Sequence, residues 1–138
     1  MTQAVRYSII VPIYNSQRVI QRCLEALANQ TVPRQQYEIL VVDDGSTEPV
    51  PQSLETNPDI HLIHIPHGGP AAARNAGVAA ARGDIVAFTD SDCAPAPDWL
   101  EKITQPFRIK RVVGVKGVYR TQQKGLIARF VQLEYQYK

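Results

Sequence analysis

A pair of aspartates follows directly on a short apolar run, and no other stretch constrains the chain as strongly. The run covers residues 85–88 (IVAF), and Asp90 and Asp92 come just after it, one residue apart. Such a run is typical of a strand covered on both faces. If the backbone stays extended, residues i and i+2 point the same way, so both carboxylates would face one point. Like charges that close are costly unless a cation or a shared proton relieves them, and two hard oxygen ligands suit Mg²⁺ or Mn²⁺.

The length and composition are those of one ordinary globular domain. We expect residues 1–138 to form that domain, since 44% of the 138 residues are hydrophobic and 20% are charged. The net charge of +2 gives no electrostatic argument for a nucleic-acid partner, and we expect none. The two cysteines lack metal or redox spacing, and no signal peptide or membrane span is recognisable. A cytoplasmic location is therefore expected, although a longer protein could associate with a membrane.

Strand-like and helix-like patterns alternate along the whole chain. Strands are predicted over residues 6–13, 37–42, 60–65, 84–89 and 112–119. Helices are predicted between and after them: one capped by Asn15 or Ser16 and closed by residues 29–33, one each over residues 50–56 and 71–82, one capped by Asp98, and one over residues 125–138. This order predicts an α/β, Rossmann-like fold, with a mostly parallel sheet and helices on both faces.

Polar side chains follow three of the predicted strands, at the edge where sheets of this kind bind ligands. They are Tyr14, the pair Asp43-Asp44, and the stretch Asp90-Ser91-Asp92. Four acids at one edge indicate a binding site. Each aspartate could instead cap a helix or form a turn, and this alternative is strongest for Asp43.

Other groups at the same edge suit a nucleoside diphosphate. The loop Gly68-Gly69-Pro70 brings a helix N-terminus there, which attracts anions, although an ordinary loop is an equally good interpretation. Arg74 could pair with phosphate or with a carboxylate of this edge. Tyr14 could stack on a base or pack on the helix, and Asp44 could accept a hydrogen bond from a base N–H. Neither the dinucleotide fingerprint G-x-G-x-x-G nor a P-loop lysine is present.

Four stretches, in this order and spacing, resemble the inverting family 2 glycosyltransferases of the GT-A fold. They are SIIVPIYN, EILVVDDGS, GGPAAARNAG and IVAFTDSDC, and the likeness runs from Tyr7 to about Tyr119. Each motif alone is weak, whereas the four together are specific. The resemblance implies metal-dependent transfer of a sugar from a nucleotide sugar, often a UDP-sugar, with inversion and with Mn²⁺ or Mg²⁺ as cofactor. It also implies a role in making cell-wall or other polysaccharides, with a glycan, lipid or protein acceptor that stays unknown.

The same resemblance assigns the binding residues. Those of the base and ribose pocket are Pro12, Tyr14, Asp44 and, as an assisting residue, Asp43; those near the nucleotide are Arg74, Asp90 and Ser91; and those at the metal are Asp92 and Asp90. The stretch Asp90-Ser91-Asp92 matches the D-x-D motif, in which Asp92 is the direct metal ligand.

One part of the family pattern is not matched. In the family a later Asp or Glu removes the proton of the acceptor hydroxyl, and the sequence stops at Lys138 before such a residue. Glu134 lies on a predicted helix and is not given this role. We therefore expect the general base after Lys138, and we expect these 138 residues to be the N-terminal, donor-binding part of a longer enzyme and to be inactive alone.

Two other functions stay open at this point. The chain could be a fragment that binds a nucleotide, or only a partner, and catalyses nothing. A nucleotidyltransferase is disfavoured, because its glycine-rich basic loop after the first strand is replaced here by residues 14–17 (YNSQ). A homodimer is a further hypothesis, and the apolar positions of the last predicted helix that would support it are Leu126, Phe130, Val131, Leu133 and Tyr137.

Overall fold

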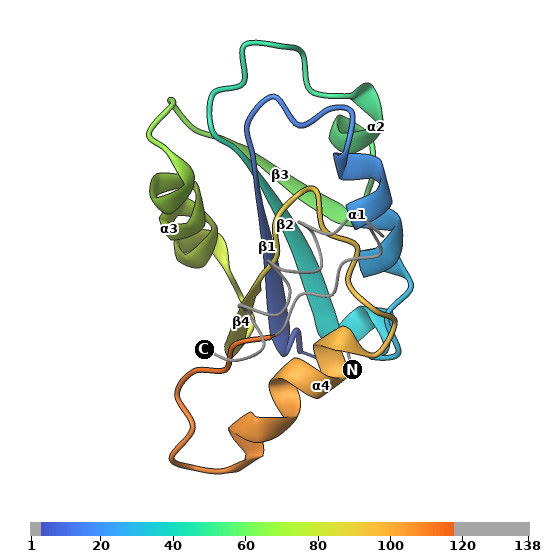
Figure 1. Cartoon of the computed structure of the whole chain (residues 1–138), viewed down its shortest axis with the longest axis vertical. Helices are drawn as coiled ribbons and strands as arrows, with labels where there is room; N and C mark the ends of the chain where they lie inside the picture. The colour runs from blue at the N-terminus through green and yellow to red at the C-terminus, as the bar shows by residue number, and fades with distance from the viewer. Residues whose placement is uncertain (1–3, 118–138) are drawn as a thin grey trace, which may run out of the picture. The chain divides into compact units, whose positions relative to one another are not determined.

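The computed structural model describes residues 4–117. Its centre is one four-stranded parallel sheet of β1 (Tyr7–Ile13), β2 (Tyr37–Asp43), β3 (Ile60–His64) and β4 (Ile85–Phe88), in the order β3-β2-β1-β4 (Figure 1). Because all four strands are parallel, their carboxyl ends meet at one edge. The predicted parallel α/β sheet is therefore confirmed.

Helices α1 (Ile20–Ala28) and α3 (Pro70–Ala80) lie on opposite faces of this sheet (Figure 1). The shorter elements are α2 (Gln52–Glu55), α4 (Trp99–Thr104) and the 3₁₀ turns η1 (Arg34–Gln36) and η2 (Gln105–Arg108). Pro70 is the first residue of α3, where its missing N–H costs nothing. No helix of residues 4–117 is long and apolar enough to cross a membrane.

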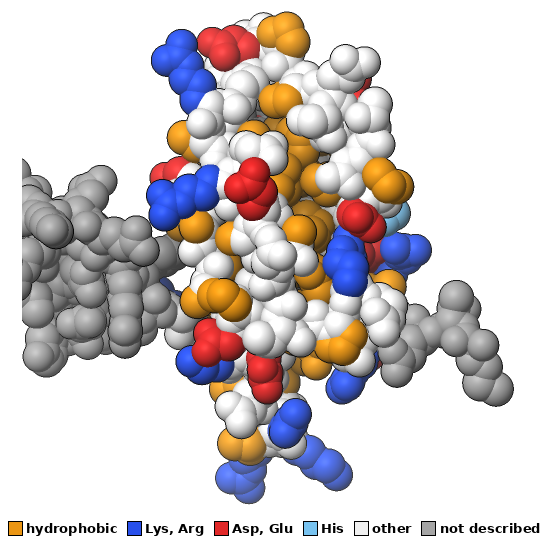
Figure 2. All heavy atoms as spheres, turned by 90° about the vertical axis from the view of Figure 1, so that its right-hand side faces the viewer, with side chains coloured by type: hydrophobic (Ala, Val, Ile, Leu, Met, Phe, Trp, Pro, Cys, Tyr) orange, Lys and Arg blue, Asp and Glu red, His pale blue; other side chains and the backbone are white. Residues whose placement is uncertain are grey.

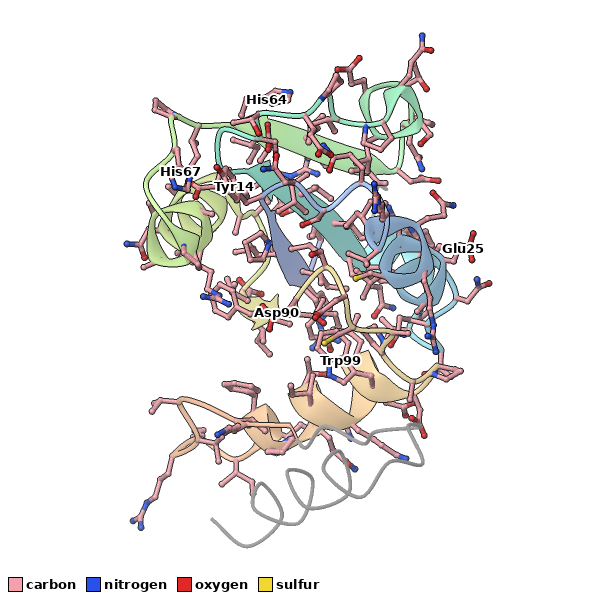
Figure 3. The ribbon with its side chains drawn as sticks, turned by 45° about the horizontal axis from the view of Figure 1, so that its top comes forward. Tyr14, Glu25, His64, His67, Asp90 and Trp99 are labelled. Atoms are coloured by element: carbon pink, nitrogen blue, oxygen red, sulfur yellow. The ribbon has the colours of Figure 1, made fainter. Side chains whose placement is uncertain are left out.

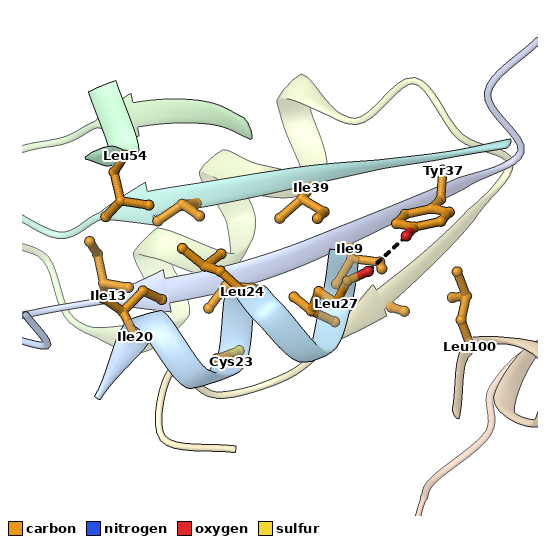
Figure 4. Close-up of a cluster of buried hydrophobic side chains, with 13 residues drawn as sticks. Ile9, Ile13, Ile20, Cys23, Leu24, Leu27, Tyr37, Ile39, Leu54 and Leu100 are labelled. Atoms are coloured by element: carbon orange, nitrogen blue, oxygen red, sulfur yellow. Dashed lines mark hydrogen bonds between the residues drawn. The ribbon is translucent and has the colours of Figure 1, made fainter. Parts of the chain in front are cut away.

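Two hydrophobic clusters hold the helices to the sheet. The cluster on the α1 face joins β1 and β2 to α1, and the hydroxyl of Tyr37 donates to the Leu27 carbonyl there over 2.7 Å (Figure 4). The cluster on the α3 face is built on Ile10, Leu40, Val42 and Ala73. A side chain at Gly77 would place its Cβ 2.6 Å from Ile10, so α3 packs closely against β1 because it has no side chain there. Helices thus cover both faces, as predicted.

The contacts of the chain define two compact units, Met1–Lys102 and Ile103–Lys138. All of the predicted binding residues belong to the first unit. On the side of the sheet covered by α1 and α2, Lys and Arg side chains lie among Asp and Glu side chains (Figure 2). The interpretation of residues 1–138 as one domain stays a prediction.

The strand predicted over residues 112–119 is wrong for residues 112–117, which form no regular element. A valine-rich segment becomes a strand where a neighbouring strand pairs with it and a core covers one face. Val113 is 93% exposed, and the Val112 N–H donates instead to the Ile109 carbonyl in a turn over 2.9 Å. The helix predicted over residues 125–138, with its proposed dimer face, lies outside the described residues.

The predicted caps of the first helix are also wrong. Helix α1 begins at Ile20 after Val19, without a side-chain cap. The Ser16 carbonyl accepts the N–H groups of Val19 and Ile20, which makes a turn before the helix. The Asn15 side chain bonds to the loop that follows β2.

The buried carboxylate of Glu38 joins β1, β2 and the segment after α3 near the amino-terminal ends of the strands, at the opposite edge of the sheet from the predicted site. Glu38 accepts hydrogen bonds from the Ser8 hydroxyl (2.6 Å), the Arg82 N–H (2.7 Å) and the Arg82 Nε (2.7 Å). Burial raises the pKa of the Glu38 carboxyl, but the hydrogen bonds from Ser8 and Arg82 outweigh burial and leave the pKa below its ordinary value.

This carboxylate predicts a pH dependence of stability. Since folding lowers the pKa of Glu38, its stabilisation is present above the unfolded-state pKa of about 4.3 and is lost as pH falls through the folded-state pKa. We expect Glu38→Gln to lower the free energy of unfolding by about 2 kcal/mol at pH 7. Below about pH 4.3 the free energy of unfolding should decrease less steeply with falling pH in this variant than in the unaltered chain. Urea unfolding from pH 7 to pH 3 measures both effects. Parallel curves for the two proteins would contradict a folded-state pKa that is lowered.

Candidate functional site

The loops after the strands meet at the carboxyl-terminal edge of the sheet, as the sequence predicts. The Asp44 N–H donates to the Ile13 carbonyl over 2.9 Å, and the Ile65 N–H donates to the Asp43 carbonyl over 2.9 Å. Pairing between β1 and β4 ends at Ile10 and Phe88, while β1 and β2 stay paired to Ile13. The loop after β1 therefore lies between the loops after β2 and β4.

Pro12 lies on this part of β1, opposite Val42 and two residues beyond the last pair with β4. It is half-buried, and Tyr14, two residues later, is 44% exposed. The Tyr14 ring stacks on the ring of His67, with centroids 4.4 Å apart and planes 29° apart (Figure 3). The sequence left two partners open for Tyr14, a base and the helix, and the residue that it contacts in the structure is a histidine of the loop before α3.

The carboxylate of Asp44 sits at the start of α3. It accepts the N–H of Gly68 over 2.8 Å and the N–H of Gly69 over 2.9 Å, and it lies 2.9 Å from Nδ1 of His67. The side chain is only 4% exposed. The helix N-terminus that was predicted to attract anions therefore binds the carboxylate of Asp44. Its negative charge is also favourable at the positive end of the dipole of α3.

Asp43 organises the turn that follows β2. One carboxylate oxygen accepts the Ser46 N–H (3.1 Å) and the Ser46 hydroxyl (2.5 Å), and the other lies 2.9 Å from Nδ1 of His64. Burial raises the pKa of the Asp43 carboxyl, but the bonds from Ser46 and His64 outweigh it and lower the pKa overall. The turn-forming role that the sequence left open for Asp43 is therefore present in the structure.

The two loops also pack tightly through Gly45. Its φ is 68°, a left-handed conformation that side chains disfavour. A Cβ at this position would lie 2.7 Å from the backbone nitrogen of His67. The close approach of the loops after β2 and β3 thus depends on a glycine here.

The predicted metal ligands converge at the end of β4. Asp90, Asp92 and Cys93 each offer a ligand atom, and these atoms lie within 4.8 Å of one another. Nη2 of Arg74 bonds to a carboxylate oxygen of Asp90 over 2.9 Å, so Arg74 takes the carboxylate partner that was one of its two predicted options. Asp92 is exposed to solvent (Asp90 is labelled in Figure 3). Ser91 faces the loop after β1, since its hydroxyl donates to the Ser16 hydroxyl over 3.1 Å.

This donor set fits Mn²⁺ or Mg²⁺ through its carboxylates. Two carboxylates that leave other positions open are the usual protein share of such a site, with phosphates and water completing it. Burial and the neighbouring Asp92 raise the pKa of the Cys93 thiol, so the thiol stays protonated and is a poor ligand for a hard cation. Cys23, a buried residue of α1, packs in the core, and burial raises the pKa of its thiol to about 12.

The partners of the predicted residues were missed in the sequence. His64 stands directly opposite Asp43 in the register of β2 and β3, so a correct alignment of these strands would have found it. His67 immediately precedes Gly68 and Gly69, at the helix N-terminus predicted to attract anions. This position was the one feature of the sequence that could have indicated a role for His67. Ser16 and Ser46 bond across loops, and nothing local in the sequence indicates such pairs.

Comparison with known proteins identifies the class of this chain. Residues 8–135 match the family described as Glycosyl transferase family 2, and the chain belongs to that family. The predicted family and the GT-A-type fold are thereby confirmed.

Two curated relatives show how much of a full-length protein is present. The chain is 44% identical over 101 residues to glycosyltransferase AglE of Haloferax volcanii, a match that covers 69% of this chain and 33% of AglE. It is 36% identical over 105 residues to the poly(ribitol-phosphate) beta-N-acetylglucosaminyltransferase TarS of Staphylococcus aureus, covering 72% of this chain and 18% of TarS. The chain thus spans about a third of one relative and less than a fifth of the other.

Two solved structures with bound nucleotides resemble this one. Residues 1–349 of S. aureus TarS in complex with UDP superpose with a TM-score of 0.68 at 29% identity, covering 88% of this chain and 40% of that one. The mannosyltransferase PcManGT of Pyrobaculum calidifontis, in complex with GDP-Man and Mn²⁺, gives a TM-score of 0.64 at 35% identity, covering 75% and 32%.

Proposed function

We propose that this chain binds the nucleotide-sugar donor and a divalent cation for an inverting glycosyl transfer, as the donor-binding part of a longer glycosyltransferase. The observation that carries the proposal is the convergence of Asp90 and Asp92 on one point, beside the loop that bears Tyr14. Two carboxylates at the carboxyl edge of a parallel sheet suit a metal-bound diphosphate.

The bound nucleotides of the similar structures support a nucleotide-sugar ligand. TarS has been solved with UDP and with UDP-GlcNAc, and PcManGT has been solved with GDP-Man and Mn²⁺. We take a UDP-sugar as the proposed donor, since the TarS structures cover the larger share of this chain. A guanosine donor is the alternative to test against it.

The described residues divide the work of donor binding. Asp92 and Asp90 would hold the cation, which when bound supplies Lewis-acid stabilisation of the leaving diphosphate. The bond from Arg74 fixes the orientation of the Asp90 carboxylate. Ser91 lies between the two aspartates in the sequence, and its hydroxyl donates to the Ser16 hydroxyl of the loop after β1.

The other half of the proposed pocket receives the nucleoside. The exposed Tyr14 ring offers a stacking surface beside Pro12. Asp44 and Asp43 shape the pocket wall through their bonds to the adjacent loops and would meet the base from that wall. The group that takes the acceptor proton is proposed to follow Lys138.

Titration calorimetry of the 138-residue chain with UDP tests this function. We expect measurable binding in Mn²⁺ and at least tenfold weaker binding in EDTA, because two clustered carboxylates repel a diphosphate that lacks a cation. GDP, titrated in parallel, distinguishes the two classes of donor. Equal UDP affinity with and without Mn²⁺ would exclude a metal-dependent site, and the absence of binding in both conditions would exclude the donor-binding function.

A further inference from the structure

We propose that Asn15 is a positioning residue that fixes Tyr14 relative to Asp44 and so sets the geometry of the base pocket. This inference rests on the proposed donor-binding function. Asn15 follows Tyr14 directly, on the loop that lies between the loops after β2 and β4.

The backbone of Asn15 is in an uncommon conformation. Its φ is 49°, and within residues 4–117 it is the one residue other than glycine with a positive φ. This left-handed region is unfavourable for most side chains, whereas asparagine tolerates it. Backbone strain of this kind persists where the surroundings hold it in place, and it gathers at functional sites. The left-handed conformation of Asn15 sets the direction of the backbone directly after Tyr14.

The Asn15 side chain supplies the bonds that hold this conformation. Its Oδ1 accepts the N–H of Thr47 over 3.0 Å and the N–H of Glu48 over 3.2 Å, and its Nδ2 donates to the Thr47 hydroxyl over 3.1 Å. Its own backbone N–H donates to the Ser46 hydroxyl over 2.9 Å. One residue thus makes bonds to three consecutive residues of the loop after β2.

These bonds continue to a buried anchor. The Ser46 hydroxyl that accepts from Asn15 donates in turn to the carboxylate of Asp43, 2.5 Å away. Asp43 is the last residue of β2, it is buried, and it immediately precedes Asp44. The backbone beside Tyr14 is therefore linked through two hydrogen bonds to the strand end that presents Asp44.

The chemistry of the link predicts which ligand groups depend on it. Asn15 is exposed and lies outside both hydrophobic clusters, so its side chain contributes little to the core. Its bonds join the two loops of the nucleoside half of the pocket, whereas Asp90 and Asp92 lie on the loop after β4. Loss of the side-chain bonds to Thr47 and Glu48 should therefore weaken binding of a nucleoside diphosphate and leave binding of inorganic pyrophosphate unchanged.

The test uses two replacements of Asn15 and a matched control in the 138-residue chain. Asn15→Gly keeps the left-handed backbone and its N–H bond to Ser46 and removes only the side-chain bonds to Thr47 and Glu48. Asn15→Asp keeps the backbone tolerance and the acceptor oxygen of the side chain. Asn57→Gly is the control, since Asn57 also accepts a backbone N–H in a turn, from Asp59, but before β3 at the other end of the sheet. The ligands are UDP and pyrophosphate, each titrated with Mn²⁺.

We expect Asn15→Gly to weaken UDP binding about tenfold, because without its three side-chain bonds the loop that bears Tyr14 is held less firmly. Pyrophosphate binding should not change, Asn15→Asp should recover most of the lost UDP affinity, and Asn57→Gly should bind both ligands as the unaltered chain does. Unchanged UDP affinity in Asn15→Gly, or an equal loss for UDP and pyrophosphate, would overturn the proposal.

A ligand-free measurement keeps this proposal separate from the proposed function. Amide hydrogen exchange of Thr47 and Glu48 should accelerate at least fivefold in Asn15→Gly, since both amides lose their acceptor, while the amides of Gly68 and Gly69 should not change. Unchanged exchange at Thr47 and Glu48 would show that the Asn15 side chain does not hold the loop after β2. If the unaltered chain binds no UDP, the donor-binding function fails, and with it the assignment of Asn15 to the base pocket, even where exchange confirms the side-chain bonds of Asn15.

Discussion

Replacement of Asp44 by alanine is expected to lower the free energy of unfolding by about 3 kcal/mol, because it leaves the partly buried amides of Gly68 and Gly69 without an acceptor. The same change removes a negative charge from the N-terminus of α3. Asp44 was singled out in the sequence as a contact for a base, yet its bonds first hold the loop before α3 against the end of β2. Chemical unfolding in urea at pH 7 measures the loss.

Two variants separate this role from a general effect of removing a charge. Asp44→Asn keeps one acceptor oxygen and should lose about half as much stability as Asp44→Ala. Asp84→Ala removes an exposed carboxylate directly before β4 and should change the free energy of unfolding by less than about 0.5 kcal/mol. A loss below about 1 kcal/mol for Asp44→Ala would contradict the structural role of this carboxylate.

The architecture could be predicted because its signals are local. The apolar runs that became β1 and β2 were placed within one residue of their observed bounds, and Pro70 marked the start of α3. Their alternation with helices was sufficient to predict a parallel sheet, and a parallel sheet brings its carboxyl ends to one edge. The meeting of Tyr14, Asp44 and Asp90 at that edge follows from topology alone.

The partners of those residues could not be predicted, because they depend on contacts between distant loops. The pairing of Asp43 with His64 requires the register of β2 and β3, and the stack of Tyr14 on His67 requires the conformations of two loops. Asn15 was expected to cap α1 because asparagine is a good cap, but its side chain found the amides of Thr47 and Glu48 instead. Local propensity was overridden here by loop packing.

The predicted strand over residues 112–119 failed for a related reason. The valine-rich composition of residues 112–119 shows that the segment is able to form a strand, and it does not show whether a neighbouring strand pairs with it. Val113 is 93% exposed in the structure, so that side chain lacks the buried face that the pattern assumes. All four strands of the central sheet were predicted to within one residue of their bounds, and each of them pairs with a neighbouring strand.

The replacement of Asp92 by asparagine is expected to have the largest effect on ligand binding. The variant should bind UDP about 100-fold more weakly in Mn²⁺, since it removes one of the two clustered carboxylates and with it half of their negative charge. Asp92 is exposed, so its change to an isosteric amide should leave the folded state intact. Calorimetric titration with UDP gives the affinity, and the electron paramagnetic resonance signal of free Mn²⁺ reports metal binding directly.

Asp84→Asn is the matched control for this prediction, since it makes the same chemical change at the opposite end of β4. It should bind Mn²⁺ and UDP as the unaltered chain does. A variant of Arg74 distinguishes the effect of charge from that of metal coordination in the same assay. The bond from Arg74 to Asp90 offsets one negative charge, so Arg74→Gln should weaken UDP binding while Mn²⁺ binding persists. If Asp92→Asn retained full Mn²⁺-dependent affinity, the metal would be held elsewhere. If it lost its circular-dichroism signal instead, Asp92 would be a structural carboxylate, in spite of its exposure.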